Sequence, residues 1–165
     1  MRLPGPGTTI SGEEKVSRQL FSVADVNAML PKIRRAADLV QRGSKQLSEL
    51  SGRLYANSRP PADTLVNAGY MAGLEQVMAG VELIGNLGGE IKDLGKGLID
   101  FPSRYLGRKV LLCWKPGEQR FAYWHDPDAG FSGRSPIENE NDFEGGLAEE
   151  QRPEHEDELD DSGRL

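Results

Sequence analysis

The chain has 165 residues, enough for one domain with tails, and only 37% of them are apolar, which predicts that part of the chain stays unfolded. Charge is unevenly spread: residues 138–165 hold 12 acids against two arginines, so a basic body of net charge +4 precedes a tail of net charge −10. A single cysteine excludes an internal disulfide framework, and no apolar run approaches the roughly 20 residues that cross a bilayer. The first residues lack the apolar core of a signal peptide, so we expect a cytoplasmic protein with no membrane segment.

Composition divides the chain into three parts. Residues 1–20 are rich in Gly, Pro, Ser and Thr and are predicted to be disordered. A single folded domain is expected over residues 21–137. The acidic residues 138–165 are predicted to form a disordered tail, because blocks of like charge repel one another.

The first helix is predicted from its start signals. Ser22 can cap the helix, and Asp25, three residues later, can bond back to it as in a capping box. Phe21 and Val26 occupy the two positions of a hydrophobic staple. Residues at a and d positions of four heptads then predict one long helix of coiled-coil type: Val26, Met29, Ile33, Ala36, Val40, Gly43, Leu47, Leu50 and Leu54.

Two sequence features should interrupt this helical region. Pro31 should kink the helix or mark a first turn, because proline lacks an amide hydrogen and crowds the preceding turn. The stretch YANSRPPADT, residues 55–64, should end the helix, and Asp63 or Thr64 can cap the next one.

A second helix is predicted to fold back on the first as a long antiparallel helical hairpin. Gly88–Gly89 is its expected stop. Its apolar seam comprises Tyr70, Leu74, Val77, Val81 and Ile84. Four internal glycines each cost about 1 kcal/mol relative to alanine, so they predict close approach of another helix or, alternatively, a ligand groove: Gly69, Gly73, Gly80 and Gly85.

After Gly89 the apolar period changes from 3.6 to 2, which predicts an α+β fold with a small four-stranded antiparallel meander. The turns LGKG and PGEQ separate the expected strands, followed by an ordered turn around AGFSGR, residues 129–134. The third strand, residues 108–115, is apolar on both faces and is therefore expected at the centre.

These segments together resemble a known family. GLIDFPS, LLCW, WHDPDAGFSGR and the opening FSVADVNAMLPKIR resemble a prokaryotic family known as domain of unknown function 2203, over roughly Phe21 to Ile137. The resemblance implies these domain limits and a bacterial, cytoplasmic origin. It implies no activity and no catalytic residue.

The candidate catalytic residues are His125, Asp126 and Asp100, and the same three are the candidate ligands of a divalent metal. Asp128 lies beside them. Strand alternation would point His125 and Asp126 to opposite faces unless the strand ends there. The alternative is that DPDAG is a turn whose carboxylates bond turn amides.

Cys113 could act as a nucleophile with His125 as base if the two were cross-strand neighbours. With PGEQ as the loop, however, Cys113 faces Ala122, and His125 lies beyond its immediate partners. We therefore expect a buried structural thiol. The chain also lacks the GxSxG, HExxH, P-loop and GxGxxG motifs.

Basic residues interleave with aromatic ones near the strands. Arg104, Arg134 and Trp124 are the candidate ligand-binding residues, since such a pattern can bind phosphates and stack bases. The alternative is a charged sheet edge that prevents strand-to-strand aggregation.

Three functions remain open. The leading one is a cytoplasmic interaction or regulatory module, a homodimer or binder of a partner helix, with Tyr70 and the glycines at the contact. Its polar site would gather Asp100, Arg104, His125, Asp126 and Arg134. The rivals are a metal-dependent hydrolase using Asp100, His125 and Asp126, and a nucleic-acid or anion-binding protein modulated by its acidic tail. No cofactor is expected beyond the candidate divalent metal.

Overall fold

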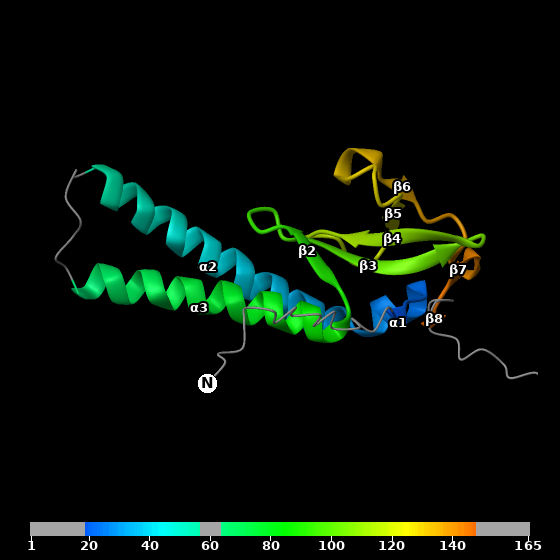
Figure 1. Cartoon of the computed structure of the whole chain (residues 1–165), viewed down its shortest axis with the longest axis horizontal. Helices are drawn as coiled ribbons and strands as arrows, with labels where there is room; N and C mark the ends of the chain where they lie inside the picture. Colours follow the sequence, from blue (N-terminus) through cyan, green and yellow to red (C-terminus); the bar gives the residue numbers. More distant parts are fainter. Residues whose placement is uncertain (1–18, 57–63, 148–165) are drawn as a thin grey trace, which may run out of the picture.

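The computed structural model of the chain describes residues 19–56 and 64–147. Two long helices lie side by side, and an antiparallel sheet packs at one end of the pair (Figure 1). The elements are β1 (Gln19–Leu20), α1 (Val23–Ala28), α2 (Leu30–Ala56), α3 (Thr64–Leu87), β2 (Glu90–Asp93), β3 (Leu98–Tyr105), β4 (Arg108–Trp114), β5 (Tyr123–His125), the 3-10 helix η1 (Phe131–Gly133), β6 (Ser135–Pro136), the 3-10 helix η2 (Glu140–Asp142), β7 (Phe143–Glu144) and β8 (Gly146–Leu147). Among these described helices, none combines the length and apolarity that crossing a membrane requires.

The predicted first helix is two helices. The capping box is confirmed, because the Ser22 hydroxyl accepts from the Asp25 amide and the Asp25 carboxylate accepts from the Ser22 amide. The helix then stops at Met29, and α2 begins at Leu30. Pro31 explains the break, since it cannot donate to a carbonyl of the preceding turn and is tolerated only in a first turn.

Three of the four glycines predicted to bring another helix close, Gly69, Gly73 and Gly80, lie against α2, whereas Gly85 has open space around it. A Cβ on Gly80 would lie 2.5 Å from a Val40 methyl, and one on Gly73 would lie 3.2 Å from the Gly43 carbonyl. Further along, the Gln46 side chain donates to the carbonyl of Gly69. Residue numbers rise along one helix as they fall along the other, so the contacts run antiparallel. Helix α2 ends at Ala56 and α3 begins at Thr64, while residues 57–63 between them, with the candidate cap Asp63, lie outside the described residues.

The apolar seam predicted for α3 is partly wrong. Val77 and Ile84 are buried, but Tyr70 and Val81 are 37% and 43% exposed. Glycines take the remaining inward positions because the backbones approach too closely there for larger side chains. The end of α3 agrees with prediction: Gly88 has φ +97°, and the Gly89 amide donates to the Ile84 carbonyl, as in a Schellman motif.

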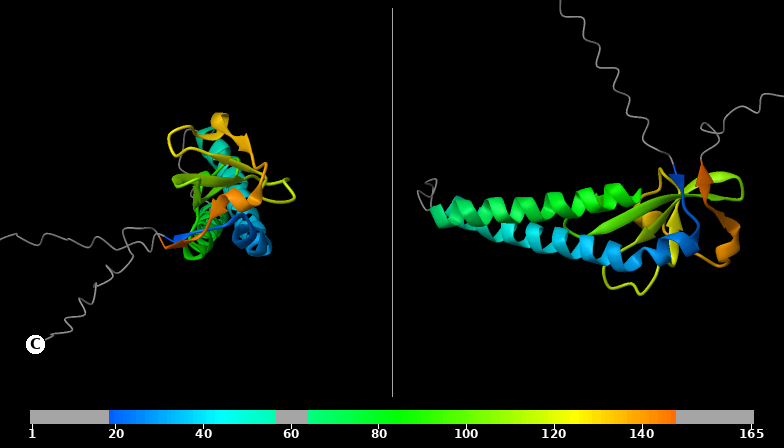
Figure 2. Two further views of the ribbon diagram at one scale, coloured as in Figure 1. Left: turned by 90° about the vertical axis from the view of Figure 1, so that its right-hand side faces the viewer. Right: turned by 90° about the horizontal axis from the view of Figure 1, so that it is seen from below.

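The sheet has six strands rather than the four expected. Strands β2 to β6 pair antiparallel in chain order, and β7 adds to β3. The central place of β4 is confirmed, with Val110, Leu112, Cys113 and Trp114 all buried. Helices α2 and α3 extend past the sheet at their far ends, where the sheet contributes no cover (Figure 2).

Described elements continue beyond the expected domain limits of 21 and 137. The two-residue strands β1 and β8 pair with each other, and β7 carries the buried Phe143. This aromatic ring packs against Tyr105 and Trp124, so an apolar anchor lies inside a stretch whose composition is acidic. The remaining residues of the two predicted disordered segments, 1–18 and 148–165, lie outside the described part.

The register between β4 and β5 differs from prediction by one residue. Cys113 lies opposite Tyr123 rather than Ala122. The cause lies just before β5: the Phe121 amide donates to the side chain of Asn27 in α1, and the Phe121 ring is buried in the core. Strand pairing therefore starts only at Tyr123. A one-residue shift exchanges the two faces of a strand.

One face of the sheet forms the core against the helices. Phe101 sits at its centre, with ring contacts to Phe21 and Phe121 at centroid distances of 5.2 and 5.9 Å. The buried cluster combines this sheet face with α1, the first turns of α2 and the end of α3; its members include Val23, Val26, Ile33, Ala36, Ile84, Ile99, Phe101, Leu112 and Trp114. The candidate site lies on the opposite face.

Candidate functional site

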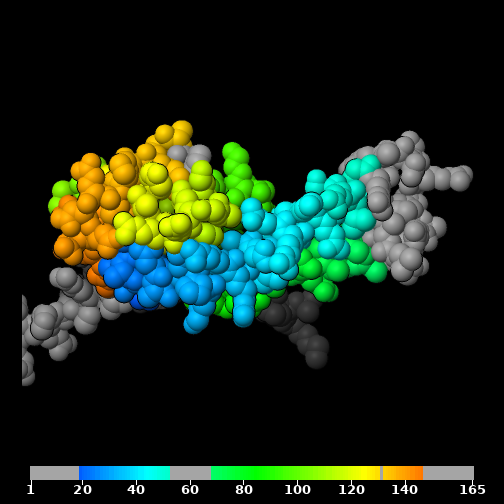
Figure 3. Space-filling model, turned by 180° about the vertical axis from the view of Figure 1, so that it is seen from behind, coloured from blue at the N-terminus to red at the C-terminus, as the bar shows by residue number. Residues whose placement is uncertain are grey.

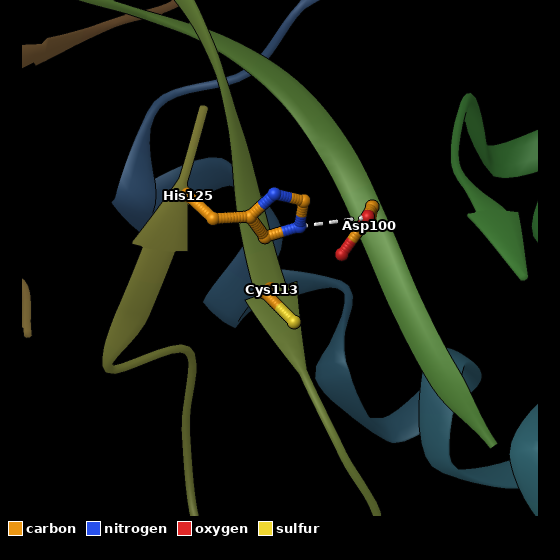
Figure 4. A group of neighbouring side chains, drawn as sticks. All are labelled: Asp100, Cys113 and His125. Carbon is orange, nitrogen blue, oxygen red and sulfur yellow. Dashed lines mark hydrogen bonds and ion pairs between the residues drawn. The ribbon is translucent and has the colours of Figure 1, made fainter. Parts of the chain in front are cut away.

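Three neighbouring strands bring Asp100, Cys113 and His125 together on the face away from the core (Figure 4). Asp100 in β3 is the direct cross-strand partner of Cys113 in β4. His125 in β5 lies two residues beyond Tyr123, the partner of Cys113, so it shares their face and reaches across β4. The corrected register therefore places the thiol in the polar cluster.

The cluster is compact and buried. Nε2 of His125 lies 3.0 Å from Oδ2 of Asp100, and one ligand atom from each of the three side chains lies within 4.8 Å of the others. Exposed fractions are 2% for Asp100, 1% for Cys113 and 4% for His125. Polar groups this deeply buried are costly unless fully paired.

Hydrogen bonding fixes the orientation of the histidine. Nδ1 lies 2.8 Å from the backbone carbonyl oxygen of Asp126, which can only accept, so Nδ1 carries a proton and Nε2 faces Asp100. Nε2 is therefore the ring nitrogen that lies in the cluster, 3.0 Å from Oδ2 of Asp100. Histidines that ligate metals are commonly oriented in this way, with the second nitrogen donating to a carbonyl.

Asp100 is only partly satisfied. Among the described residues, its Oδ1 has no hydrogen-bond partner, although the side chain is almost completely buried. An unpaired buried acceptor costs about 1–3 kcal/mol. A cation or a hydrogen-bond donor at this oxygen would therefore stabilise the cluster.

Cys113 is a free thiol that stays protonated in the isolated cluster. Burial, followed by the negative charge of Asp100, raises its pKa to about 12. A thiol is a poor nucleophile in that state, because the thiolate is the reactive form. The predicted pairing of Cys113 with His125 as nucleophile and base is therefore disfavoured, whereas a cation could replace the thiol proton.

A cavity of about 300 Å³ adjoins the cluster. Its walls come from β2, the start of β3 and the loop after β5, and the three cluster side chains form part of its lining. The residues are Lys92, Asp93, Leu98, Asp100, Cys113, His125, Pro127 and Gly130. A small molecule or water could therefore approach the cluster from this side.

The donor set fits a zinc-class ion. Sulfur, imidazole nitrogen and carboxylate oxygen are ligands that Zn²⁺ accepts in a tetrahedral arrangement, which places ligand atoms ~3.3–3.6 Å apart. The observed separations are of this order, so small side-chain movements would suffice. Three protein ligands leave a fourth position, as in catalytic rather than structural zinc sites.

Two predicted site residues, Asp100 and His125, are brought together, and the third is not. Asp126 points the other way, with its carboxylate 3.4 Å from Arg108 and about half exposed. Its carbonyl also accepts from the Ala129 amide, so the DPDAG stretch forms the expected turn. Asp126 contributes to the cluster only through its backbone.

The predicted ligand-binding residues lie elsewhere. Arg134 forms a largely buried ion pair with Glu118 at 2.7 Å, and its guanidinium lies over the Tyr123 ring. Trp124 is on the core face of the sheet, stacked on Tyr105. Arg104 lies opposite Glu144 in the register of β3 and β7.

Cys113 is the cluster member that sequence reasoning missed. The one-residue error in register placed it on the wrong face relative to His125. In the observed register Asp100, Cys113 and Tyr123 lie directly opposite one another, and no signal within the strands reveals this alignment.

Comparison with known proteins gives a family but no activity. Residues 19–137 match the family described as Uncharacterized conserved protein (DUF2203). No curated protein and no solved structure matches the chain significantly. The chain thus belongs to the DUF2203 family of uncharacterized conserved proteins.

Proposed function

We propose that this protein binds a zinc-class divalent ion through Asp100, Cys113 and His125 and uses it at a site open to the adjoining cavity. The observation that carries the proposal is the convergence of three buried donors of different type, one of which, Oδ1 of Asp100, lacks a partner among the described residues. A bound cation would satisfy that oxygen and replace the thiol proton of Cys113.

The donor types favour a borderline or soft metal. Mg²⁺ and Ca²⁺ prefer oxygen ligands, whereas a thiolate and an imidazole favour Zn²⁺, Co²⁺ or a similar ion.

Hydrolysis is the reaction class that such a site supports. A metal ion with an open position lowers the pKa of a bound water and polarises a substrate carbonyl or phosphoryl oxygen. The chain supplies the three ligands, the Asp126 carbonyl that orients His125, and a cavity of about 300 Å³ for a small substrate. This refines the hydrolase hypothesis by exchanging Asp126 for Cys113.

Cobalt substitution tests the proposal. The full-length protein, stripped with a chelator, is titrated with Co²⁺, and thiolate-to-cobalt charge-transfer absorption is recorded. We expect one equivalent to bind with this band and with the visible spectrum of a tetrahedral site. Cys113→Ser should lose the charge-transfer band, and Asp126→Asn, the matched control, should keep it. Equal spectra for the wild type and Cys113→Ser would refute the assignment.

A second proposed function is self-association through α3. The supporting observation is a stripe of exposed apolar side chains on one flank of this helix, namely Tyr70, Met71, Met78 and Val81. Glycines 69, 73 and 80 contact the chain's own α2, so they would not form that interface; Gly85 has open space around it. Native mass spectrometry should show a dimer that Met78→Glu disrupts, and a monomer at all concentrations would exclude this function.

A further inference from the structure

A groove separates the first turns of α2 from the last turns of α3. It encloses about 490 Å³ and is called the α2–α3 groove; its lining residues are Pro31, Lys32, Arg35, Leu83, Asn86 and Leu87. Helix α2 runs along one broad face of the molecule, below the yellow-green β4 and β5 region (Figure 3). The α2–α3 groove is separate from the metal cluster, with which it shares no lining residue.

The α2–α3 groove carries two cations that the fold does not use. Lys32 and Arg35 are exposed, and neither forms an ion pair or side-chain hydrogen bond with any residue in the described part of the chain. Two neighbouring arginines of α2 are engaged by contrast: Arg42 pairs with Asp38, and Arg34 donates to the Gln119 carbonyl. Two adjacent unpaired cations attract a negatively charged segment.

Apolar surface lies directly beside these cations. Leu83 is 39% exposed, and Pro31 and the half-buried Leu87 line the same groove. A partner that satisfies both parts must combine several carboxylates with an apolar side chain.

We propose that the α2–α3 groove is the docking site of the chain's own acidic C-terminal segment, residues 148–165. This segment holds eight acids and two arginines, and Leu159 lies within its densest acidic run, EHEDELDD. Its charge complements Lys32 and Arg35, and a leucine among carboxylates matches the exposed Leu83.

The position of the preceding strand makes this docking geometrically feasible. Leu147 in β8 pairs with Gln19 in β1, and two residues later the Phe21 ring lies against Gly88, next to the end of α3. Residues 148–165 therefore follow directly on a strand that lies near the Leu87 end of the α2–α3 groove. Ten extended residues span up to about 35 Å, more than six helical turns, so the acidic run can reach Lys32.

Docking of this segment would make the α2–α3 groove a regulated surface. An acidic partner or nucleic-acid backbone could bind there only after displacing the segment, because both would use the same cations. High salt would weaken the internal contact, since exposed charges are screened within about 8–10 Å at physiological ionic strength.

Carbodiimide cross-linking of the full-length protein tests the proposal, because this reagent joins an amine only to a carboxylate in direct contact with it. An equal mixture of ¹⁴N- and ¹⁵N-labelled chains is treated at low concentration, and linked peptides are identified by mass spectrometry. We expect Lys32 to link to carboxylates of residues 149–161 within one chain. Lys45, exposed on the same helix about 20 Å away, is the control and should link several-fold less.

Two substitutions probe the two parts of the α2–α3 groove. Arg35→Glu and Leu83→Ser should each reduce the Lys32 link several-fold without unfolding the protein, as both side chains are exposed. Equal linking of Lys32 and Lys45 would overturn the proposal. Links that join only differently labelled chains would assign the α2–α3 groove to a second copy and would overturn it as well.

Discussion

The two faces of strands β3 and β4 are built on different principles. On the core face, Ile99, Phe101 and Leu112 are fully buried among apolar neighbours. On the other face, Asp100 and Cys113 are just as deeply buried, but with polar atoms that the described residues satisfy only in part. Alternate residues of the same two strands thus form the apolar core on one face and a buried polar site on the other. Buried polar groups left unpaired lower stability, so their presence points to a function rather than to the fold.

The largest test of this contrast is truncation on the core face. Phe101→Ala should lower the free energy of unfolding by about 3–5 kcal/mol, because a fully buried ring contacting Phe21 and Phe121 is removed. Urea denaturation measures the loss. The adjacent Asp100→Asn, on the other face and nearly isosteric, should change stability much less without metal. Equal losses for both would show that the polar face is as important for cohesion as the core.

Metal addition should stabilise the protein through the polar face alone. At a free Zn²⁺ concentration about 100-fold above the dissociation constant, the free energy of unfolding should rise by about 2.7 kcal/mol. His125→Ala should abolish this rise, and Asp126→Asn should retain it. Thermal unfolding with and without a chelator provides the measurement; a full rise in His125→Ala would place the ion elsewhere.

Close packing on the core side extends to the contact between α2 and α3. Gly80→Ala should destabilise by about 1–3 kcal/mol, because the new Cβ would lie 2.5 Å from Val40 and 2.6 Å from the Ala36 carbonyl. Gly85→Ala is the matched control on the same helix. Its Cβ has open space, so the better helix propensity of alanine should stabilise by up to about 1 kcal/mol. Chemical denaturation measures the free energy of unfolding of both variants. Similar changes in Gly80→Ala and Gly85→Ala would contradict this packing.

The last effect, at alkaline pH, is the smallest when measured over a single pH unit. Folding raises the Cys113 pKa from 9.0 to about 12, so above pH 9 the unfolded chain loses a proton that the folded chain retains. Stability should therefore be complete below pH 9 and fall by on the order of 1 kcal/mol per pH unit between pH 9 and 12. With a chelator present, unfolding curves at several pH values should show this extra slope in the wild type and lack it in Cys113→Ala. Parallel pH curves would show that the thiol is not buried as described.

Local signals in the sequence predicted much of the fold. The capping box at Ser22, the stop at Gly88 and the central place of β4 follow from residue chemistry within a few positions. The two extra strands of the sheet and the contact of Phe143 were not predictable in this way, because one aromatic residue inside an acidic stretch gives no periodic pattern.

The candidate site was half predicted. Asp100 and His125, which the structure brings together, were both among the candidate ligands, but Cys113 was not joined to them. Its placement depends on the Phe121 amide bonding to Asn27, a contact between residues 94 positions apart. Such a tertiary contact sets the register of β5, and neither propensity nor alternation within the strand reveals it.

The reach of His125 across β4 has a consequence for folding. All three donors lie between positions 100 and 125, on consecutive strands of one meander, so the loops that close the site are short and cost little chain entropy. A shift of β5 by one residue would turn His125 to the other face of the sheet and remove it from Asp100 and Cys113. An ion bound by all three side chains would therefore stabilise only the register in which Cys113 pairs with Tyr123. Chains with a shifted β5 would not gain this stabilisation.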